Sequence, residues 1–197
     1  MGITTLSAGD GVKEMQRTDG YDALIGANRG CADAFAGVYD CAVPVVVAVQ
    51  GFCLGGGIGL VGNADVIVAS DDATFGLPEV DCGALGGATH MARLVPQHLM
   101  RALCYTASTV DAPTLHQHGS VYRVVLRADL DETAMGVARE IASKDTRIIR
   151  CDKEAINGID VQNVHRSYRF EQGFTFELNL VGVSDARRQA FIDGKAG

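Results

Sequence analysis

The stretch that decides the fold runs from Val45 to Gly62 and has the sequence VVVAVQGFCLGGGIGLVG. Its first five residues are apolar and mostly β-branched, which is typical of a buried strand. The three glycines at 55–57 predict a tight turn and the start of a closely packed helix over residues 55–63. The uncharged segment Cys41–Ala64 is long enough to span a bilayer, but its glycines and Pro44 favour a strand, a turn and a helix.

Weaker patterns continue on both sides of this stretch. The periodicity of the apolar residues predicts a loop and a helix, then alternating short strands and helices, and finally helices alone. The expected ranges are 1–18 (loop), 19–40 (helix), 65–69 and 74–76 (strands), 88–95, 97–106 and 111–117 (helices), 121–125 (strand) and 129 onward (helices). The front two thirds is therefore α/β and the last third all-α, with a hinge near residues 126–130.

One segment of the last third carries two periodicities. Apolar residues between Phe174 and Leu180 alternate with a period of two, which locally indicates a strand. Tyr168, Glu171, Phe174 and Leu178 also fit one face of a helix. We expect a helix, because the segment lies in a long helical stretch with no second strand to pair with.

Composition narrows the function classes. The chain has 197 residues, of which 47% are hydrophobic and 21% charged, and this favours one folded domain with a core of its own. A net charge of −7 without any run of Lys or Arg argues against nucleic acids and anionic membranes as partners. The six cysteines form no C-x-x-C pair and no zinc spacing, so we expect buried reduced thiols and no metal. No secretory signal pattern opens the sequence, which predicts a cytoplasmic protein.

The glycine cluster allows three interpretations. Gly57, Gly59 and Gly62 match G-x-G-x-x-G, but a nicotinamide fingerprint directly follows its strand, and here the residues 50–56 intervene. Glycines can also simply relieve a close helix–strand crossing. The third interpretation is chemical: consecutive glycines at a helix start leave backbone N–H groups unshielded, and such groups can stabilise a developing oxyanion.

The residues downstream carry a family resemblance. After the glycines come Asn63-Ala-Asp65, then Ala73-Thr-Phe-Gly-Leu-Pro-Glu79, and then the pair Gly86-Gly87. In this order and spacing the block resembles the crotonase (enoyl-CoA hydratase/isomerase) superfamily, and the likeness extends to Ser184-Asp185 near the C-terminus. The resemblance implies a crotonase-like α/β fold with a ββα superhelical core over residues 1–127, which lacks the family's first strands. It also implies a C-terminal helical oligomerisation segment over residues 128–197.

A narrower likeness suggests the reaction. Residues 13–24, the loop 78–87, Leu94–Leu99 and Phe174–Leu180 are similar to actinobacterial crotonases of steroid degradation. That likeness implies hydrolytic C–C opening of a ring in a CoA thioester, with no cofactor besides the CoA of the substrate, in a homotrimer or homohexamer. Two alternatives stay open: an enoyl-CoA hydratase or isomerase of β-oxidation, and a non-catalytic truncated paralogue that only oligomerises.

The resemblance also assigns residues to roles. It places the two N–H donors of an oxyanion hole at Ala8 and Gly56, and a catalytic carboxylate at Glu79. Gly59 occupies the position of the second glutamate of hydratases, so one carboxylate is missing, and the space left there would suit a bulky fused-ring acyl group. The resemblance further implies contacts with substrate or CoA from residues beside these positions: Gly9, Gly11, Val12, Gly55 and Pro78.

Four further residues have both a functional and a structural interpretation. Asp81 lies two residues after Glu79, and in an extended segment it would point to the same side as a second carboxylate; alternatively it is a solvated loop acid. His90 could orient a water or a ring ketone, or could be a helix-packing or surface histidine. Lys13 and Lys195 are candidates for the CoA phosphates, or ordinary solvated lysines.

Overall fold

Two small sheets form the centre of the protein. The computed structural model describes residues 5–8, 20–161 and 163–194. The first sheet has the order β1-β3-β5-β6 and the second has the order β2-β4-β7. Neighbouring strands are parallel except for β5 and β6. The strands are β1 (Thr5–Ala8), β2 (Val46–Val49), β3 (Phe52–Leu54), β4 (Val66–Ser70), β5 (Thr74–Gly76), β6 (Thr109–Asp111) and β7 (Arg123–Val125).

The chain passes from one sheet to the other twice in the same way. β2 in the second sheet is followed after two residues by β3 in the first sheet and then by the short helix α3 (Gly56–Val61). β4 is followed likewise by β5, and then by the 3-10 helix η1 (Pro78–Cys82) and α4 (Ala88–Met91). These two successive units confirm the predicted ββα core.

The main hydrophobic core lies among these units. Its fully buried side chains come from β2, β3, α3, β5, α4 and α6 (Ala112–Gln117), and include Val49, Cys53, Ile58, Phe75, Met91 and Leu115. A smaller cluster joins β4 to α7 (Leu130–Ala142) through Val68, Leu130, Ala134 and Val137. Burial of this apolar surface, at about 25 cal/mol per Å², is the main force that holds strands of only three to five residues together.

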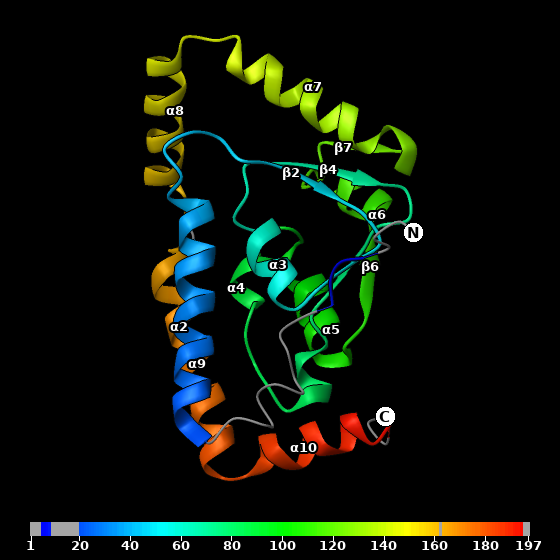
Figure 1. Cartoon of the computed structure of the whole chain (residues 1–197), viewed down its shortest axis with the longest axis vertical. Helices are drawn as coiled ribbons and strands as arrows, with labels where there is room; N and C mark the ends of the chain where they lie inside the picture. Colours follow the sequence, from blue (N-terminus) through cyan, green and yellow to red (C-terminus); the bar gives the residue numbers. More distant parts are fainter. Residues whose placement is uncertain (1–4, 9–19, 162, 195–197) are drawn as a thin grey trace.

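Helices enclose the sheets on several sides. Figure 1 shows α7 above the strands, α8, α2 and α9 along one side, and α10 below. Lys153 of α8 forms an ion pair with Asp65 beside β4 (2.6 Å), and Gln172 of α9 donates to the Asn28 carbonyl of α2 (2.6 Å). The helices are α2 (Gly20–Tyr39), α5 (Gln97–Thr106), α6 (Ala112–Gln117), η2 (Arg127–Asp129), α7 (Leu130–Ala142), α8 (Thr146–Ile159), α9 (Val164–Leu180) and α10 (Val183–Ile192).

Several sequence-based expectations need correction. Residues 1–18 were expected to be a loop, but Thr5–Ala8 is a strand because it pairs with β3. Strands β3 and β6 were not expected, and α4 ends at Met91 rather than near residue 95. The ambiguous segment Phe174–Leu180 is helical, as expected, within α9. The division into a core and an oligomerisation segment stays a prediction.

The structure shows whether the six cysteines are buried and whether a described helix could cross a membrane. None of the six cysteines forms a disulfide bond; Cys53 is buried but Cys151 is exposed, so the expectation of uniformly buried thiols is wrong. Burial raises the pKa of Cys53 to about 12 and, with a further contribution from nearby Glu79 and Glu171, that of Cys104 to about 11. No helix in the described ranges combines the length and the apolarity that a membrane crossing requires.

Candidate active site

The residues predicted to form the catalytic site, namely Ala8, Gly56 and Glu79, come from segments that meet at one edge of the first sheet. Because β1, β3 and β5 are parallel, their carboxyl ends lie at the same edge. Ala8 at the end of β1 is opposite Leu54 at the end of β3, and Leu54 is opposite Gly76 at the end of β5. The glycine turn follows Leu54 directly, and Glu79 lies three residues beyond Gly76. Neighbouring strands are about 4.8 Å apart, so these segments lie side by side.

The glycine turn has the geometry that its sequence predicts. Gly55 adopts φ 55° and ψ −119°, a conformation that side-chain-bearing residues rarely take, and its N–H donates to the Gly76 carbonyl (3.2 Å). Gly56 is the first residue of α3, so its N–H has no carbonyl partner within that helix. Both glycines line a pocket. The turn therefore places a helix-start N–H group in a residue that lines a cavity.

Glu79 lines the same pocket from the 3-10 helix η1. Pro78 begins η1 with its fixed φ, and Gly83 ends it in the left-handed region at φ 68°. The Glu79 carbonyl accepts from Ala84 N–H (2.9 Å), which folds the loop after η1 back onto its start. The Glu79 side chain is half-buried and lines the pocket together with Gly56.

Because η1 is helical, Asp81 does not point to the same side as Glu79, as an extended segment would require. Residues two apart on a 3-10 helix, with three residues per turn, point in different directions, whereas the expectation rested on an extended chain. Asp81 is half-exposed, and within the described part of the chain it does not line the pocket. The extended-chain argument for a second carboxylate therefore does not hold, and the geometry favours the alternative, a solvated loop acid.

The pocket is narrow and is built from five parts of the chain. It encloses about 590 Å³ with its mouth included, of which about 70 Å³ is wide enough for a water molecule to move in. Its walls come from α2, the glycine turn, η1 with the following loop, α9 and α10. The lining residues are Leu24, Ala27, Asn28, Phe35, Gly55, Gly56, Glu79, Ala84, Leu85, Gly86, Gly87, Tyr168, Thr175 and Arg188.

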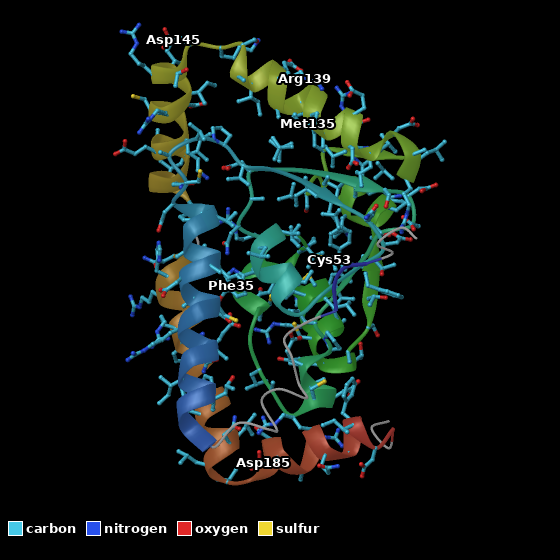
Figure 2. The ribbon with its side chains drawn as sticks, in the orientation of Figure 1. Phe35, Cys53, Met135, Arg139, Asp145 and Asp185 are labelled. Carbon is cyan, nitrogen blue, oxygen red and sulfur yellow. The ribbon has the colours of Figure 1, made fainter. Side chains whose placement is uncertain are left out.

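The space beside Gly59 is filled. A Cβ atom added at Gly59 would lie 2.2 Å from Phe35 Cζ, so the phenyl ring packs directly on the glycine backbone. Figure 2 shows Phe35 on the side of α2 that faces the interior. Gly59 does not itself line the pocket, whereas Phe35 does. The expectation that Gly59 leaves room for an acyl group is therefore wrong: the glycine accommodates Phe35, and Phe35 forms the wall.

His90 packs behind this wall. It is fully buried, its Nδ1 lies 3.0 Å from Asn63 Nδ2, and its ring centroid is 5.0 Å from that of Phe35 and 4.7 Å from that of Tyr168. Burial, with a smaller contribution from the Arg93 charge, lowers the pKa of His90 to about 4. A neutral, enclosed imidazole outside the pocket lining favours the helix-packing alternative over a role toward water or a ketone.

Glu171, to which the sequence analysis assigned no functional role, anchors the end of the loop that contains Gly86 and Gly87. Glu171 of α9 accepts from the N–H groups of Ala88 (2.9 Å) and Thr89 (2.5 Å) at the start of α4, and from the Thr89 hydroxyl. Burial raises the pKa of Glu171, although these hydrogen bonds oppose the shift. Because Gly86 and Gly87 line the pocket just before α4, Glu171 positions one of its walls.

Several predicted residues lie outside the described ranges. These are the loop residues Gly9, Gly11 and Val12 and the two candidate phosphate ligands, Lys13 and Lys195. Conversely, Asn28, Phe35, Tyr168, Thr175 and Arg188 line the pocket although no local motif marks them. In the described ranges, no group of three His, Cys, Asp or Glu side chains is placed to hold a metal ion.

The fold and the site together match one class of protein. The chain alternates between two sheets of mostly parallel strands, and a glycine turn and a glutamate follow the strands at one carboxyl edge. The family model described as enoyl-CoA hydratase/isomerase matches residues 4–178, and the chain belongs to this family. A crystal structure of an enoyl-CoA hydratase/isomerase from Xanthobacter autotrophicus Py2 superposes with a TM-score of 0.84 at 26% identity, covering 98% of this chain and 74% of that chain.

Two curated relatives are much more similar in sequence. Over 187 residues, 95% of this chain and 72% of the relative, the chain is 71% identical to the (7aS)-7a-methyl-1,5-dioxo-2,3,5,6,7,7a-hexahydro-1H-indene-carboxyl-CoA hydrolase of Rhodococcus jostii (strain RHA1). It is 69% identical over 186 residues to the hydrolase of the same name from Mycobacterium tuberculosis (strain ATCC 25618 / H37Rv), covering 94% of this chain and 75% of the relative.

Proposed function

We propose that this protein is an acyl-CoA hydrolase that opens a ring of a fused-ring CoA thioester in steroid degradation. The observation that carries the proposal is the identity of 71% and 69% to two hydrolases of an indene-carboxyl-CoA ester. A dioxo fused-ring substrate offers ring ketones, which water can attack. Family membership supports a thioester substrate whose carbonyl oxygen carries the developing charge.

The oxyanion hole is proposed at Ala8 and Gly56. Ala8 ends β1 directly beside Leu54, and Gly56 follows Leu54 by two residues, so the two segments are adjacent at the sheet edge. Backbone donors aimed at a thioester oxygen would stabilise the enolate that forms when a ring carbon–carbon bond breaks. Removal of one such donor typically costs about 3–4 kcal/mol of transition-state stabilisation.

Glu79 is proposed as the general base. Glu79 lines the same pocket as Gly56, and the position of the second hydratase glutamate is Gly59, which packs under Phe35. With one carboxylate, the site can take a proton from an attacking water and return it to carbon. Such a single acid–base group accounts for hydrolysis, in which one proton is moved from water to the leaving carbon.

Assembly and CoA binding complete the proposal. We expect a cytoplasmic homotrimer or homohexamer, with Lys13 and Lys195 as donors to the CoA phosphates and no cofactor besides the substrate's own CoA. Exposed apolar side chains on α8, namely Ile148, Ile156 and Ile159, support an association surface. Light scattering coupled to size exclusion would measure the mass, and a monomer at micromolar concentration would contradict the assembly.

The reaction is tested by isotope labelling. The indene-carboxyl-CoA ester is incubated with the protein in oxygen-18 water, with Glu79→Gln as the matched control, and the products are analysed by tandem mass spectrometry. The expected product retains CoA and carries one labelled oxygen in a new carboxylic acid. Release of free CoA thiol would indicate thioester cleavage instead, and a labelled hydroxyl on an intact ring would indicate a hydratase; either result contradicts the proposal.

A further inference from the structure

A buried arginine of the C-terminal helix α10 lines the pocket. Arg188 of α10 is only 7% exposed, and it lines the same cavity as Glu79 and Gly56. A guanidinium stays charged under all physiological conditions, and its burial costs free energy unless its donors find acceptors. Its partners therefore show what the position is built for.

The partners within the chain satisfy only part of the guanidinium. Nη2 donates to Asn179 Oδ1 (2.9 Å) and pairs with Asp185, whose side chain is 67% exposed. Nε is buried and finds no acceptor among the described residues. A fork of five donors with its inner N–H unsatisfied, on the wall of a cavity, is suited to an oxygen atom of a ligand.

The arginine is held in place rather than free to turn away. Ser184, one helical turn earlier on the same face of α10, is fully buried and donates to the Gly83 carbonyl (2.5 Å). Gly83 ends η1, the segment that carries Glu79. Figure 2 shows Asp185, which pairs with the guanidinium, on α10 below the central elements. The docking of α10 onto η1 thus ties the guanidinium to the loop of the general base.

A second residue that lines the pocket also carries a buried donor. Asn28 Nδ2, from α2, is also buried without an acceptor among the described residues, and Asn28 lines the pocket. A pocket for a hydrocarbon acyl chain has no use for unsatisfied donors, because each one raises the cost of excluding water. Two such donors indicate an acyl group that carries its own oxygen atoms beyond the thioester.

We infer that Arg188 binds the ring carbonyl oxygen that water attacks, and then the carboxylate that replaces it. This inference rests on the proposed ring opening. Glu79 takes a proton from water as the water oxygen bonds to the carbonyl carbon, and the carbonyl π pair moves onto the oxygen beside Arg188. When C=O re-forms, the ring carbon–carbon bond breaks, its electron pair enters the enolate of the thioester, and Glu79 returns the proton to carbon. The attacked ketone has then become a carboxylic acid, which ionises against the guanidinium.

If Arg188 binds a carboxylate, the protein should bind an acyl-CoA whose acyl chain ends in a carboxylate more tightly than one that ends in a methyl group. This difference in affinity can be measured without any catalysis. We would measure, by titration calorimetry, the binding of adipyl-CoA, which ends in a carboxylate, and of hexanoyl-CoA, which has the same chain length and ends in a methyl group. The wild-type protein should bind adipyl-CoA at least tenfold more tightly. Arg188→Gln should abolish the preference by weakening adipyl-CoA alone, and Arg188→Lys should retain part of it. Arg187→Gln, an exposed neighbour on α10, should leave both affinities unchanged.

Failure of the inference about Arg188 and failure of the proposed ring-opening function give different results. If the wild-type protein shows no preference for adipyl-CoA, or if Arg188→Gln retains it, the inference about Arg188 is overturned even where the ring opens. An equal loss of affinity for both ligands in Arg188→Gln would indicate a purely structural role and would also overturn it. If the preference behaves as expected but no fused-ring ester is hydrolysed, the ring-opening function fails and the anion site remains. The wild-type comparison decides the matter if a variant does not fold.

Discussion

The buried histidine behind the pocket wall makes stability depend on pH. Asn63 Nδ2 donates to the Gly59 carbonyl (2.8 Å) and lies 3.0 Å from His90 Nδ1, so the imidazole nitrogen accepts and its proton sits on Nε2. A second proton on Nδ1 would face a donor inside a fully buried site. The folded protein therefore keeps His90 neutral, with a pKa of about 4, whereas the unfolded chain titrates near the ordinary value of 6.5.

The sign and size of the effect follow from linkage. Between about pH 6.5 and pH 4 the unfolded chain binds a proton that the folded chain does not, so stability falls as the pH falls through this window. A difference of about 2.5 in pKa, at about 1.36 kcal/mol for each unit, corresponds to about 3 kcal/mol lost below pH 4. That is a large share of the 5–15 kcal/mol typical of a domain.

The assay compares three proteins. Urea unfolding of the wild type, His90→Gln and the exposed-histidine control His118→Gln is followed by circular dichroism at fixed protein concentration, from about pH 7.5 to about pH 4. Gln keeps an acceptor for Asn63 but does not titrate. The wild type should lose about 3 kcal/mol more than His90→Gln over this range, and the control should follow the wild type. Equal losses for the wild type and His90→Gln would refute the linkage.

Three further substitutions test the packing and the site. Gly59→Ala should destabilise by about 1–3 kcal/mol through its clash with Phe35, and most of that penalty should vanish in a Phe35→Ala background; an additive double mutant would show that the two sites are independent. Lys153→Met should cost about 3 kcal/mol, at the low end for a broken buried ion pair because Asp65 is 21% exposed; chemical unfolding measures it, and a change under 1 kcal/mol would contradict it. Gly56→Pro, which removes the proposed oxyanion donor, should abolish turnover in a steady-state assay while the far-ultraviolet spectrum stays native; retained turnover would place the hole elsewhere.

Local sequence predicts those elements whose pattern is complete in one stretch. The β-branched run before the glycines marks β2, and the glycines mark the turn and α3. By contrast, β1, β3 and β6 have three or four residues each, too few for a period to show, and they exist because of pairing across the sheet. The alternating segment within α9 could be assigned only from its context, and Thr175 of that segment donates to the Leu85 carbonyl (2.8 Å) as part of the helix.

The residues of the candidate site also fall into two groups, those that a local motif marks and those that only tertiary packing brings into the pocket. Gly56 and Glu79 belong to a continuous motif, so the family resemblance could single them out from the sequence, and both line the pocket. The extended-chain argument for Asp81 does not hold, because the backbone after Pro78 turns into a 3-10 helix rather than an extended strand. The walls could not be predicted, because Phe35 and Arg188 come from helices about 150 residues apart that meet only when α2, α9 and α10 pack together.

Whether Glu79 is the catalytic base is decided by the single-turnover rate of Glu79→Gln on the indene-carboxyl-CoA ester, measured together with its affinity for the same ester. Gln keeps the size and polarity of the side chain but cannot take a proton from water. We expect a rate lower by about 10²–10⁴-fold with the affinity unchanged, because a general base acts in the transition state and not in binding. A rate equal to that of the wild type would show that the proton goes elsewhere, and would contradict the assignment of Glu79 as the single catalytic carboxylate.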